Sequence, residues 1–432
     1  MGRWSAPLVV PVHLRHRRKE QWRAPVRVVR PAQGPAPVDV AKGCWSGFGH
    51  QEAPQAHGEE EAPQAVEEDS RPATPPRQVA PGRDMGRVVL VTGVSQDLGG
   101  RLARRISTDP EVSRVVGVDA VPPRQDLAAV RFVRADIRNP VIAKVIAGED
   151  VDTVVHTSVV ASAALVGGRT SMKDHNVIGT MQLLAACQRA PGLERLVVKS
   201  SAEVYGSSSR DPAMFTEDMT AKRPPQGGYG KDVLEVEGYV RGFSRRRPDV
   251  VVTQLRNAST VASYTRSPLG DYLRLNPTPK VIGYDARFQL LHYDDLVAVL
   301  HHAALAGVHG TFNVAGDGML MMSQAIHRLG HRVLPLPRLT LGALGSLVRQ
   351  SGLGLPDFTP EQLQFLTYGR GLDATRMREV LGFEPRYTTE QALLEFASSV
   401  TSPTRVTHPV VLAESLVSGV LAGILAGGGR GG

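Results

Sequence analysis

The chain has 432 residues, 42% of them hydrophobic and 21% charged, with a formal net charge of +8 at pH 7. This length is too great for one minimal domain and allows a core of two packed lobes. Two cysteines, Cys44 and Cys187, are too far apart to predict a metal site or a disulfide framework. We therefore expect no metal, and a cytoplasmic location fits the low cysteine content.

Residues 1–84 differ in composition from the rest of the chain. Prolines, arginines and glutamates crowd there with few aromatic residues, so this stretch cannot bury enough apolar surface to offset its ordering entropy. We expect a disordered, solvated arm that binds no nucleic acid. One alternative is an arm whose basic start contacts RNA, DNA or anionic lipid. Another is a biological chain that starts at Met85.

From Arg87 onward, apolar runs alternate with helical stretches. The runs at 87–93, 112–120, 151–158 and 193–201 predict buried strands, and residues 99–108 have the spacing of a helix. Continuous valine-rich strands are typical of a parallel sheet that is covered on both faces. The alternation predicts an α/β, Rossmann-like doubly wound domain over residues 85–255.

The loop VTGVSQDLGG, residues 91–100, joins the first strand to the first helix. Glycines here allow a tight turn and let backbone N–H groups at the helix N-terminus approach a pyrophosphate. Asp119 ends the next strand, where a carboxylate accepts hydrogen bonds from ribose hydroxyls. It would repel a 2′-phosphate, so NAD is favoured over NADP, although Arg124 is near. An ordinary turn with an ordinary strand-end aspartate is the alternative.

Beyond about Leu255 the pattern is less regular. Residues 256–400 predict a smaller α/β lobe with amphipathic helices at 294–305 and 391–400, and loops suited to substrate contact. The tail, 401–432, contains an apolar stretch that holds Glu414 and ends in glycines. A buried or surface-lying helix is favoured there over a membrane span.

With these motifs, the chain from about Arg87 to Ser399 resembles the extended short-chain dehydrogenase/reductase family, the NAD-dependent epimerases and dehydratases that include UDP-glucose 4-epimerase. The family's TGxxGxxG loop matches the sequence except at Gln96, which stands in place of the middle glycine. The strings ADIRN and NVIGTMQLL resemble the adenine-side motif and an interior helix. The cofactor-binding residues that the resemblance implies are Thr92, Gly93, Gln96, Leu98, Gly99, Asp119, Asp136, Ile137 and Asn176.

The resemblance also implies a reaction site. Ser201 of SSAEVYG would hydrogen-bond a substrate oxygen while Tyr229 of YGKDVLEVEGY exchanges the proton. The family's lysine, four residues after the tyrosine, is Val233 here, and Lys231 points to another face of a helix. An unassisted phenol is ionised in about one molecule in a thousand at neutral pH. The alternative is a strand-end hydroxyl and a packed aromatic ring with no chemistry.

The predicted function is an NAD-dependent oxidoreductase of the epimerase/dehydratase type that acts on a carbinol. A nucleotide sugar is the substrate that the resemblance suggests, although the arginine that epimerases use for its diphosphate aligns with Phe288, one step from Arg287. Related folds often form homodimers. The alternative, a catalytically impaired NAD(H)-binding sensor or scaffold, accounts for both Val233 and Gln96.

Overall fold

The computed structural model describes residues 86–161, 167–338, 340–341 and 359–401. The predicted arm at 1–84 and the apolar tail after residue 401 lie outside these ranges. Within them, no helix is long and apolar enough to cross a membrane.

A seven-stranded sheet carries the first lobe, in the order β11-β6-β5-β4-β1-β2-β3. Its strands are β1 (Arg87–Thr92), β2 (Val112–Asp119), β3 (Arg131–Arg134), β4 (Thr153–His156), β5 (Arg195–Ser201), β6 (Val251–Asn257) and β11 (Gly310–Val314). Every neighbouring pair is parallel. The strand order reverses between β1 and β4, which opens a crevice at their carboxyl ends.

Helices cover both faces of this sheet, as the continuous valine-rich strands predict. On one face Val89 shares a core with Leu102 and Leu300, and on the other Leu90 shares a core with Leu183. The first core receives α1 (Asp97–Ser107) and α7 (Tyr293–Ala306), and the second receives α2 (Val141–Gly148), α4 (Gly179–Gln188) and α5 (Gly228–Arg246). The prediction of a doubly wound, Rossmann-like α/β fold is confirmed.

Short helical segments join these layers. They are α3 (Arg169–Lys173), the π-helical turn η2 (Asp174–Ile178) and the 3₁₀ turn η3 (Ala202–Tyr205). The turn η3 follows β5 directly, so the end of this strand and the start of α5 meet beside it.

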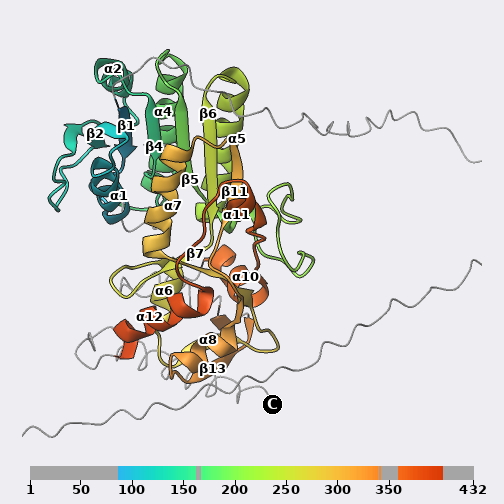
Figure 1. Cartoon of the computed structure of the whole chain (residues 1–432). Coiled ribbons are helices and arrows are strands. Elements are labelled where there is room, and N and C mark those ends of the chain that lie inside the picture. The colour runs from blue at the N-terminus through green and yellow to red at the C-terminus, as the bar shows by residue number, and fades with distance from the viewer. Residues whose placement is uncertain (1–85, 162–166, 339, 342–358, 402–432) are drawn as a thin grey trace, which may run out of the picture. The chain divides into compact units, whose positions relative to one another are not determined.

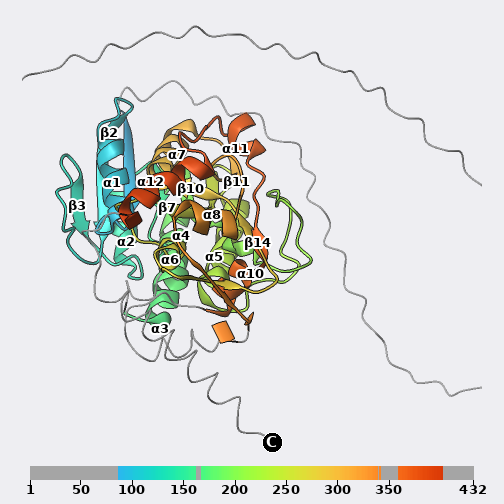
Figure 2. The ribbon, with the colours of Figure 1, turned by 90° about the horizontal axis from the view of Figure 1, so that it is seen from below.

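The second lobe lies at the carboxyl ends of the parallel strands. In Figure 1, β7 (Ser259–Val261) continues from β6 toward this lobe, below the main sheet. Its other strands are β8 (Thr278–Val281), β9 (Arg287–Phe288), β10 (Leu290–His292), β12 (Leu320–Met321), β13 (Val333–Leu336) and β14 (Gly369–Arg370). Its helices are α6 (Pro268–Leu273), α8 (Met322–Arg328), α10 (Pro360–Tyr368) and α12 (Thr389–Thr401). The short helix α11 (Thr375–Glu379) instead packs on the core of the first lobe through Met377. Figure 2 shows α6, α8, α10 and α12 from below. The predicted helices at 294–305 and 391–400 are α7 and α12.

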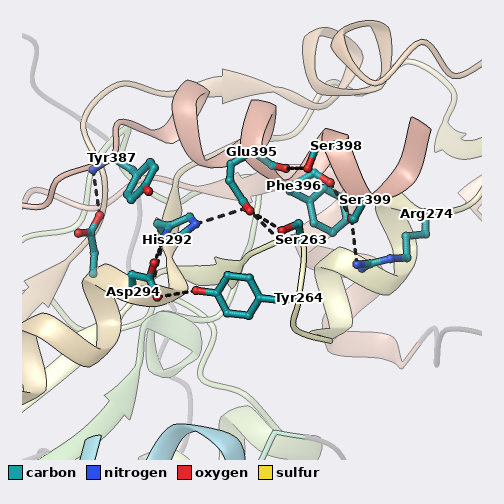
Figure 3. A network of polar contacts seen from close by, with 11 residues as sticks. Ser263, Tyr264, Arg274, His292, Asp294, Tyr387, Glu395, Phe396, Ser398 and Ser399 are labelled. Atoms are coloured by element: carbon teal, nitrogen blue, oxygen red, sulfur yellow. Dashed lines mark hydrogen bonds and ion pairs between the residues drawn. The ribbon is translucent and has the colours of Figure 1, made fainter. Parts of the chain in front are cut away.

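A polar network fastens α12 to the start of α7 (Figure 3). The Glu395 carboxylate accepts hydrogen bonds from the backbone N–H of Ser263 at 2.9 Å and from its hydroxyl. His292 Nε2 lies 3.3 Å from the same carboxylate. Tyr264, the residue after Ser263, extends this network to α1. The guanidinium of Arg101 on α1 lies 4.6 Å from the centre of the Tyr264 ring. The second lobe is thereby linked to the helix that starts at the crevice.

Candidate functional site

The loop between β1 and α1 has the backbone that a dinucleotide site needs. Gly93 adopts a φ of +78°, which other residues rarely adopt. A Cβ on Gly99 would lie 2.3 Å from the Gly93 carbonyl oxygen, so only glycine lets helix and loop approach this closely. No side chain caps the N-terminus of α1, and its first N–H groups are therefore available to an anion.

Gln96 does not distort this loop. It precedes α1 with a φ of −87° and a ψ of 154°, a conformation that any residue adopts. Its carbonyl oxygen accepts the hydrogen bond from the N–H of Gly100 at 3.0 Å. The middle glycine of the motif is therefore not required by the backbone. Leu98, in the first turn of α1, packs on the core of that face.

Asp119 stands beside the loop at the end of β2. Its carboxylate accepts hydrogen bonds from the N–H groups of Ser95 at 3.1 Å and of Ala120 at 2.7 Å. The carboxylate is only partly buried and has acceptor capacity left for ribose hydroxyls. Loop, helix terminus and carboxylate together fit the adenosine and pyrophosphate portions of NAD.

Two of the residues expected to bind the cofactor, Thr92 and Asn176, are buried, and their side chains form hydrogen bonds with backbone groups. The Thr92 hydroxyl lies 2.9 Å from His156 Nδ1 and accepts from the N–H of Thr157 at 3.2 Å. The Asn176 amide pairs twice with Val160, accepting from its N–H and donating to its C=O, both at 2.9 Å. These side chains fix the segments after β1 and β4 that form the crevice walls.

Asp136 and Ile137 also differ in their surroundings. The Asp136 carboxylate is paired with the Arg138 guanidinium, with Nη2 to Oδ2 at 2.6 Å, and this hydrogen bond lowers the pKa of Asp136. Ile137 is buried against Gly179, where a Cβ would lie 2.9 Å from its Cδ1 atom. Asp136 is thus partly exposed, whereas Ile137 is buried in the core.

The two residues expected to carry the chemistry are brought together. Ser201 ends β5, and its hydroxyl accepts from the N–H of Glu203 at 3.2 Å. Tyr229 lies in the first turn of α5, and its phenol is hydrogen-bonded to Ser201. Burial and then the Glu203 carboxylate raise the pKa of the Tyr229 phenol, while the bond to Ser201 opposes them. The pair can bind a substrate hydroxyl, but the resting phenol is strongly protonated.

The helix supplies no cation to this phenol. Val233 is 0% exposed and packs in the same apolar core as Tyr229, whereas the Lys231 side chain is exposed. Since α5 begins at Gly228, both residues lie in regular helix. As expected, Lys231 lies on a different face of α5 from Val233.

A different lysine, which sequence reasoning missed, reaches the phenol from the sheet. Lys199 Nζ lies 3.5 Å from Tyr229 Oη and donates to the Val159 carbonyl at 3.1 Å. Burial lowers the pKa of Lys199 to about 8, although the negative charge of Glu203 acts to raise it. The sequence could have predicted this position. Residues two apart on a strand share a face, and Lys199 is two residues before Ser201.

A pocket of about 260 Å³ is lined by residues of the loop after η3 and of the second lobe, and neither Ser201 nor Tyr229 lines it. Its lining includes the guanidinium groups of Arg287 and Arg370 and the rings of Tyr284 and Tyr368, whose centres are 5.5 Å apart, edge to face. Arg370 Nε donates to the Gly206 carbonyl at 2.7 Å, just beyond η3. The pocket therefore combines two arginines, one aspartate, Asp211, and aromatic surface.

The arginine of the epimerases aligns with Phe288, and Arg287 is its neighbour in the sequence. Phe288 is fully buried in the second lobe's core, while Arg287 lines the pocket. Arg370 lies on β14, which pairs with β9 although the two strands are far apart in the sequence. Sequence reasoning found the first arginine one step off and did not find the second.

Comparisons with known proteins agree with this geometry. The model of the NAD dependent epimerase/dehydratase family matches residues 89–315. An uncharacterized protein of Mycobacterium tuberculosis is 48% identical over 314 residues, which cover 72% of this chain and 83% of the relative. The UDP-glucose 4-epimerase of Mycolicibacterium smegmatis is 26% identical over 330 residues, covering 70% of this chain and 95% of that protein.

Solved structures share the fold. UDP-glucose 4-epimerase of Thermotoga maritima, solved with UDP-glucose, aligns with a TM-score of 0.55 at 18% identity and covers 72% of this chain and 98% of its own. The dTDP-glucose 4,6-dehydratase of Bacillus anthracis, in complex with NAD, aligns with a TM-score of 0.54 at 20% identity, over 75% and 100%. The predicted cofactor, NAD, is the cofactor of the matched family. The chain belongs to the NAD dependent epimerase/dehydratase family.

Proposed function

We propose that this protein is an NAD-dependent oxidoreductase of the epimerase/dehydratase type that acts on a carbinol of a nucleotide sugar. The observation that carries the proposal is the hydrogen-bonded pair of Ser201 and Tyr229 at the end of β5. A hydroxyl and a phenol in contact can bind one substrate oxygen and exchange its proton.

The roles of the chain's own residues follow from their places. The N-terminus of α1, with Gly93 and Gly99, would hold the pyrophosphate, and Asp119 would hold the adenosine ribose. When bound, NAD supplies the acceptor and donor of a hydride. Ser201 orients the substrate hydroxyl, and Tyr229 receives its proton.

The pocket supports a nucleotide sugar as substrate. Guanidinium groups bind phosphate oxygens with two parallel hydrogen bonds, and Arg287 and Arg370 both line the pocket. The rings of Tyr284 and Tyr368 offer an apolar surface for a base. In this proposal Arg287 and Arg370 bind the diphosphate in place of the arginine that is missing at Phe288.

A second function, an NAD(H)-binding sensor or scaffold, is favoured by the buried phenol. Burial and Glu203 raise the pKa of Tyr229, and the helix position of the usual lysine is apolar. A protein of this kind would bind NAD without turnover.

The substitution Tyr229→Phe separates the two functions. Purified protein is incubated with NAD⁺ and a panel of UDP- and dTDP-sugars, and conversion is followed by proton NMR and by NADH absorbance. We expect the wild type to convert at least one sugar and Y229F to be slower by about 100-fold or more, as for loss of a general acid–base group.

Tyr239→Phe is the matched control, because Tyr239 lies on the same helix and is 39% exposed. It should leave the rate unchanged. Wild-type protein that binds NAD⁺ but converts no sugar in the panel would favour the sensor, and equal rates in Y229F and wild type would exclude the role given to the phenol.

A further inference from the structure

The reaction site contains a cation that no motif of the family accounts for. The Lys199 ammonium lies 3.5 Å from the phenol oxygen of Tyr229 and 6.0 Å from the centre of its ring. Within the described ranges it forms no ion pair, and its other contact is the Val159 carbonyl at 3.1 Å. Its charge therefore acts on the phenol without a carboxylate in direct contact.

The strand explains how the ammonium gets there. Lys199 and Ser201 lie on the same face of β5 because they are two residues apart, and Ser201 contacts the phenol. The long side chain of Lys199 reaches the phenol oxygen of Tyr229 from this face. Ser201 approaches the same phenol from the end of the strand. Tyr229 is thus held between a hydroxyl and an ammonium that come from one strand.

We propose that Lys199 on β5 takes the place of the missing helix lysine and stabilises the phenolate form of Tyr229. The assignment rests on the proposed function, since it treats Tyr229 as the acceptor of the substrate hydroxyl proton. That proton moves from the substrate oxygen to the phenolate oxygen and returns by the same path. Lys199 keeps its three protons in this step, which requires a pH below its lowered pKa of about 8.

Other titratable groups lie around the pair and limit this effect. They are Glu203 on η3, His156 on β4, Asp232 on α5, Arg370 on β14 and Glu361 on α10. The Asp232 carboxylate is neutralised by the Arg169 guanidinium at 2.6 Å, and burial lowers the pKa of His156 to about 3, so that it is uncharged. Glu203 is the group that opposes Lys199 at the phenol while favouring the charged ammonium.

A purely structural role for Lys199 makes a different prediction. If the ammonium served only to hold the Val159 carbonyl, its removal would lower stability and leave the ionisation of Tyr229 unchanged. The ionisation of this one phenol is therefore the measurement that separates the two roles.

The experiment compares wild type, Lys199→Met and the control Lys231→Met, each with and without Tyr229→Phe, in saturating NAD⁺. Ultraviolet difference titration of each pair isolates the Tyr229 phenol from the other tyrosines. We expect wild type and K231M to ionise Tyr229 at the same pH. In K199M the ionisation should move up by about one pH unit or more, or leave the accessible range.

Calorimetry with NAD⁺ alone separates the possible failures. If NAD⁺ does not bind to wild type, the proposed function falls. If NAD⁺ binds but wild type ionises Tyr229 no more readily than K199M, the assignment of Lys199 is overturned while NAD binding stands. Circular dichroism checks that each variant is folded.

The double variant Lys199→Met, Val233→Lys moves the charge to the helix position. Val233 packs in the same core as Tyr229, so a lysine there can direct its ammonium toward the space that Lys199 leaves. We expect the ionisation of Tyr229 to return toward the wild-type value. A folded double variant that titrates like K199M would contradict a role based on charge at the phenol.

Discussion

At the scale of single residues, the central quantity is the free energy needed to ionise Tyr229 near neutral pH. Lowering a phenol pKa from about 10 to about 7 requires roughly 4 kcal/mol. A unit charge 3.5 Å away contributes about 5 kcal/mol at an effective dielectric constant of 20. Lys199 is therefore of sufficient magnitude by itself, but burial and Glu203 act in the opposite direction. NAD⁺, which carries positive charge on its nicotinamide ring, would have to offset part of that opposition.

The glycine loop gives a prediction at the same scale. In Gly99→Ala the new methyl group would lie 2.3 Å from the Gly93 carbonyl oxygen, which is backbone and cannot step aside. Overpacking of this kind costs about 1–3 kcal/mol and displaces the N-terminus of α1. We expect G99A to bind NAD⁺ about tenfold more weakly or worse, measured by calorimetry, and to unfold at lower urea concentration.

Gly148→Ala is the control for that substitution. Gly148 is also helical, but a Cβ there meets no atom within 4 Å. We expect unchanged NAD⁺ affinity and equal or slightly greater stability, because alanine favours helix. If G99A bound NAD⁺ as tightly as G148A, the loop would not hold the pyrophosphate as proposed.

At the scale of elements, a buried ion pair fixes the strand and the helix that carry the reaction residues. Glu237 on α5 binds the Arg256 guanidinium of β6 with two hydrogen bonds, at 3.0 and 2.7 Å. The same carboxylate accepts from the Ser200 hydroxyl at 2.5 Å, next to Ser201. The positions of Tyr229 and Ser201 relative to one another therefore depend on a carboxylate that neither of them touches.

Removing Glu237 should be costly because it leaves the guanidinium buried without its partner. For Glu237→Ala we expect a loss of about 3–5 kcal/mol in the free energy of unfolding, measured by urea denaturation. Arg266→Ala opens the exposed pair with Asp271 and should cost about 0–1 kcal/mol. Similar losses in the two variants would mean that the pair does not hold β6 to α5.

The elements themselves were largely predictable from the sequence. Valine-rich runs predicted the strands β1, β2, β4 and β5, and the loop with Gly93 and Gly99 predicted the start of α1, because both depend on local patterns, whereas the short strand β3 was not predicted. Lys199 was missed because a lysine in such a run has no local reason to be there, and its partner is 30 residues away. Thr92 and Asn176 matched motifs, but motifs do not show whether a side chain faces the cofactor or the backbone behind it.

At the scale of the whole molecule, the site is assembled from parts of the chain that are far apart. The strand β11 returns to the main sheet from within the second lobe and pairs with β6, and α7 covers the sheet after leaving β10. Arg370, which lines the pocket, follows both β11 and α7 in the sequence. A five-residue strand or a lone arginine carries too little pattern to predict these long-range pairings.

The stability of the whole fold should depend on pH through His156. This side chain bridges β1 and α4, with Nδ1 2.9 Å from the Thr92 hydroxyl and Nε2 2.9 Å from that of Thr180. Burial lowers its pKa from 6.5 to about 3 in the folded state. Below pH 6.5 the unfolded chain binds a proton that the folded protein does not, so stability falls as pH falls and is fully present above 6.5.

The expected loss from His156 between pH 7.5 and pH 5.0 is about 2 kcal/mol in the free energy of unfolding. Other histidines with lowered pKa values add to the total in wild type, so the informative quantity is the difference between wild type and His156→Gln. Urea denaturation at the two pH values should show that H156Q is less stable at pH 7.5 but loses about 2 kcal/mol less on acidification. His327→Gln, at an exposed position on α8, should lose as much as wild type. If H156Q showed the same acid loss as wild type, His156 would not be the neutral, buried link between the central strands that its contacts indicate.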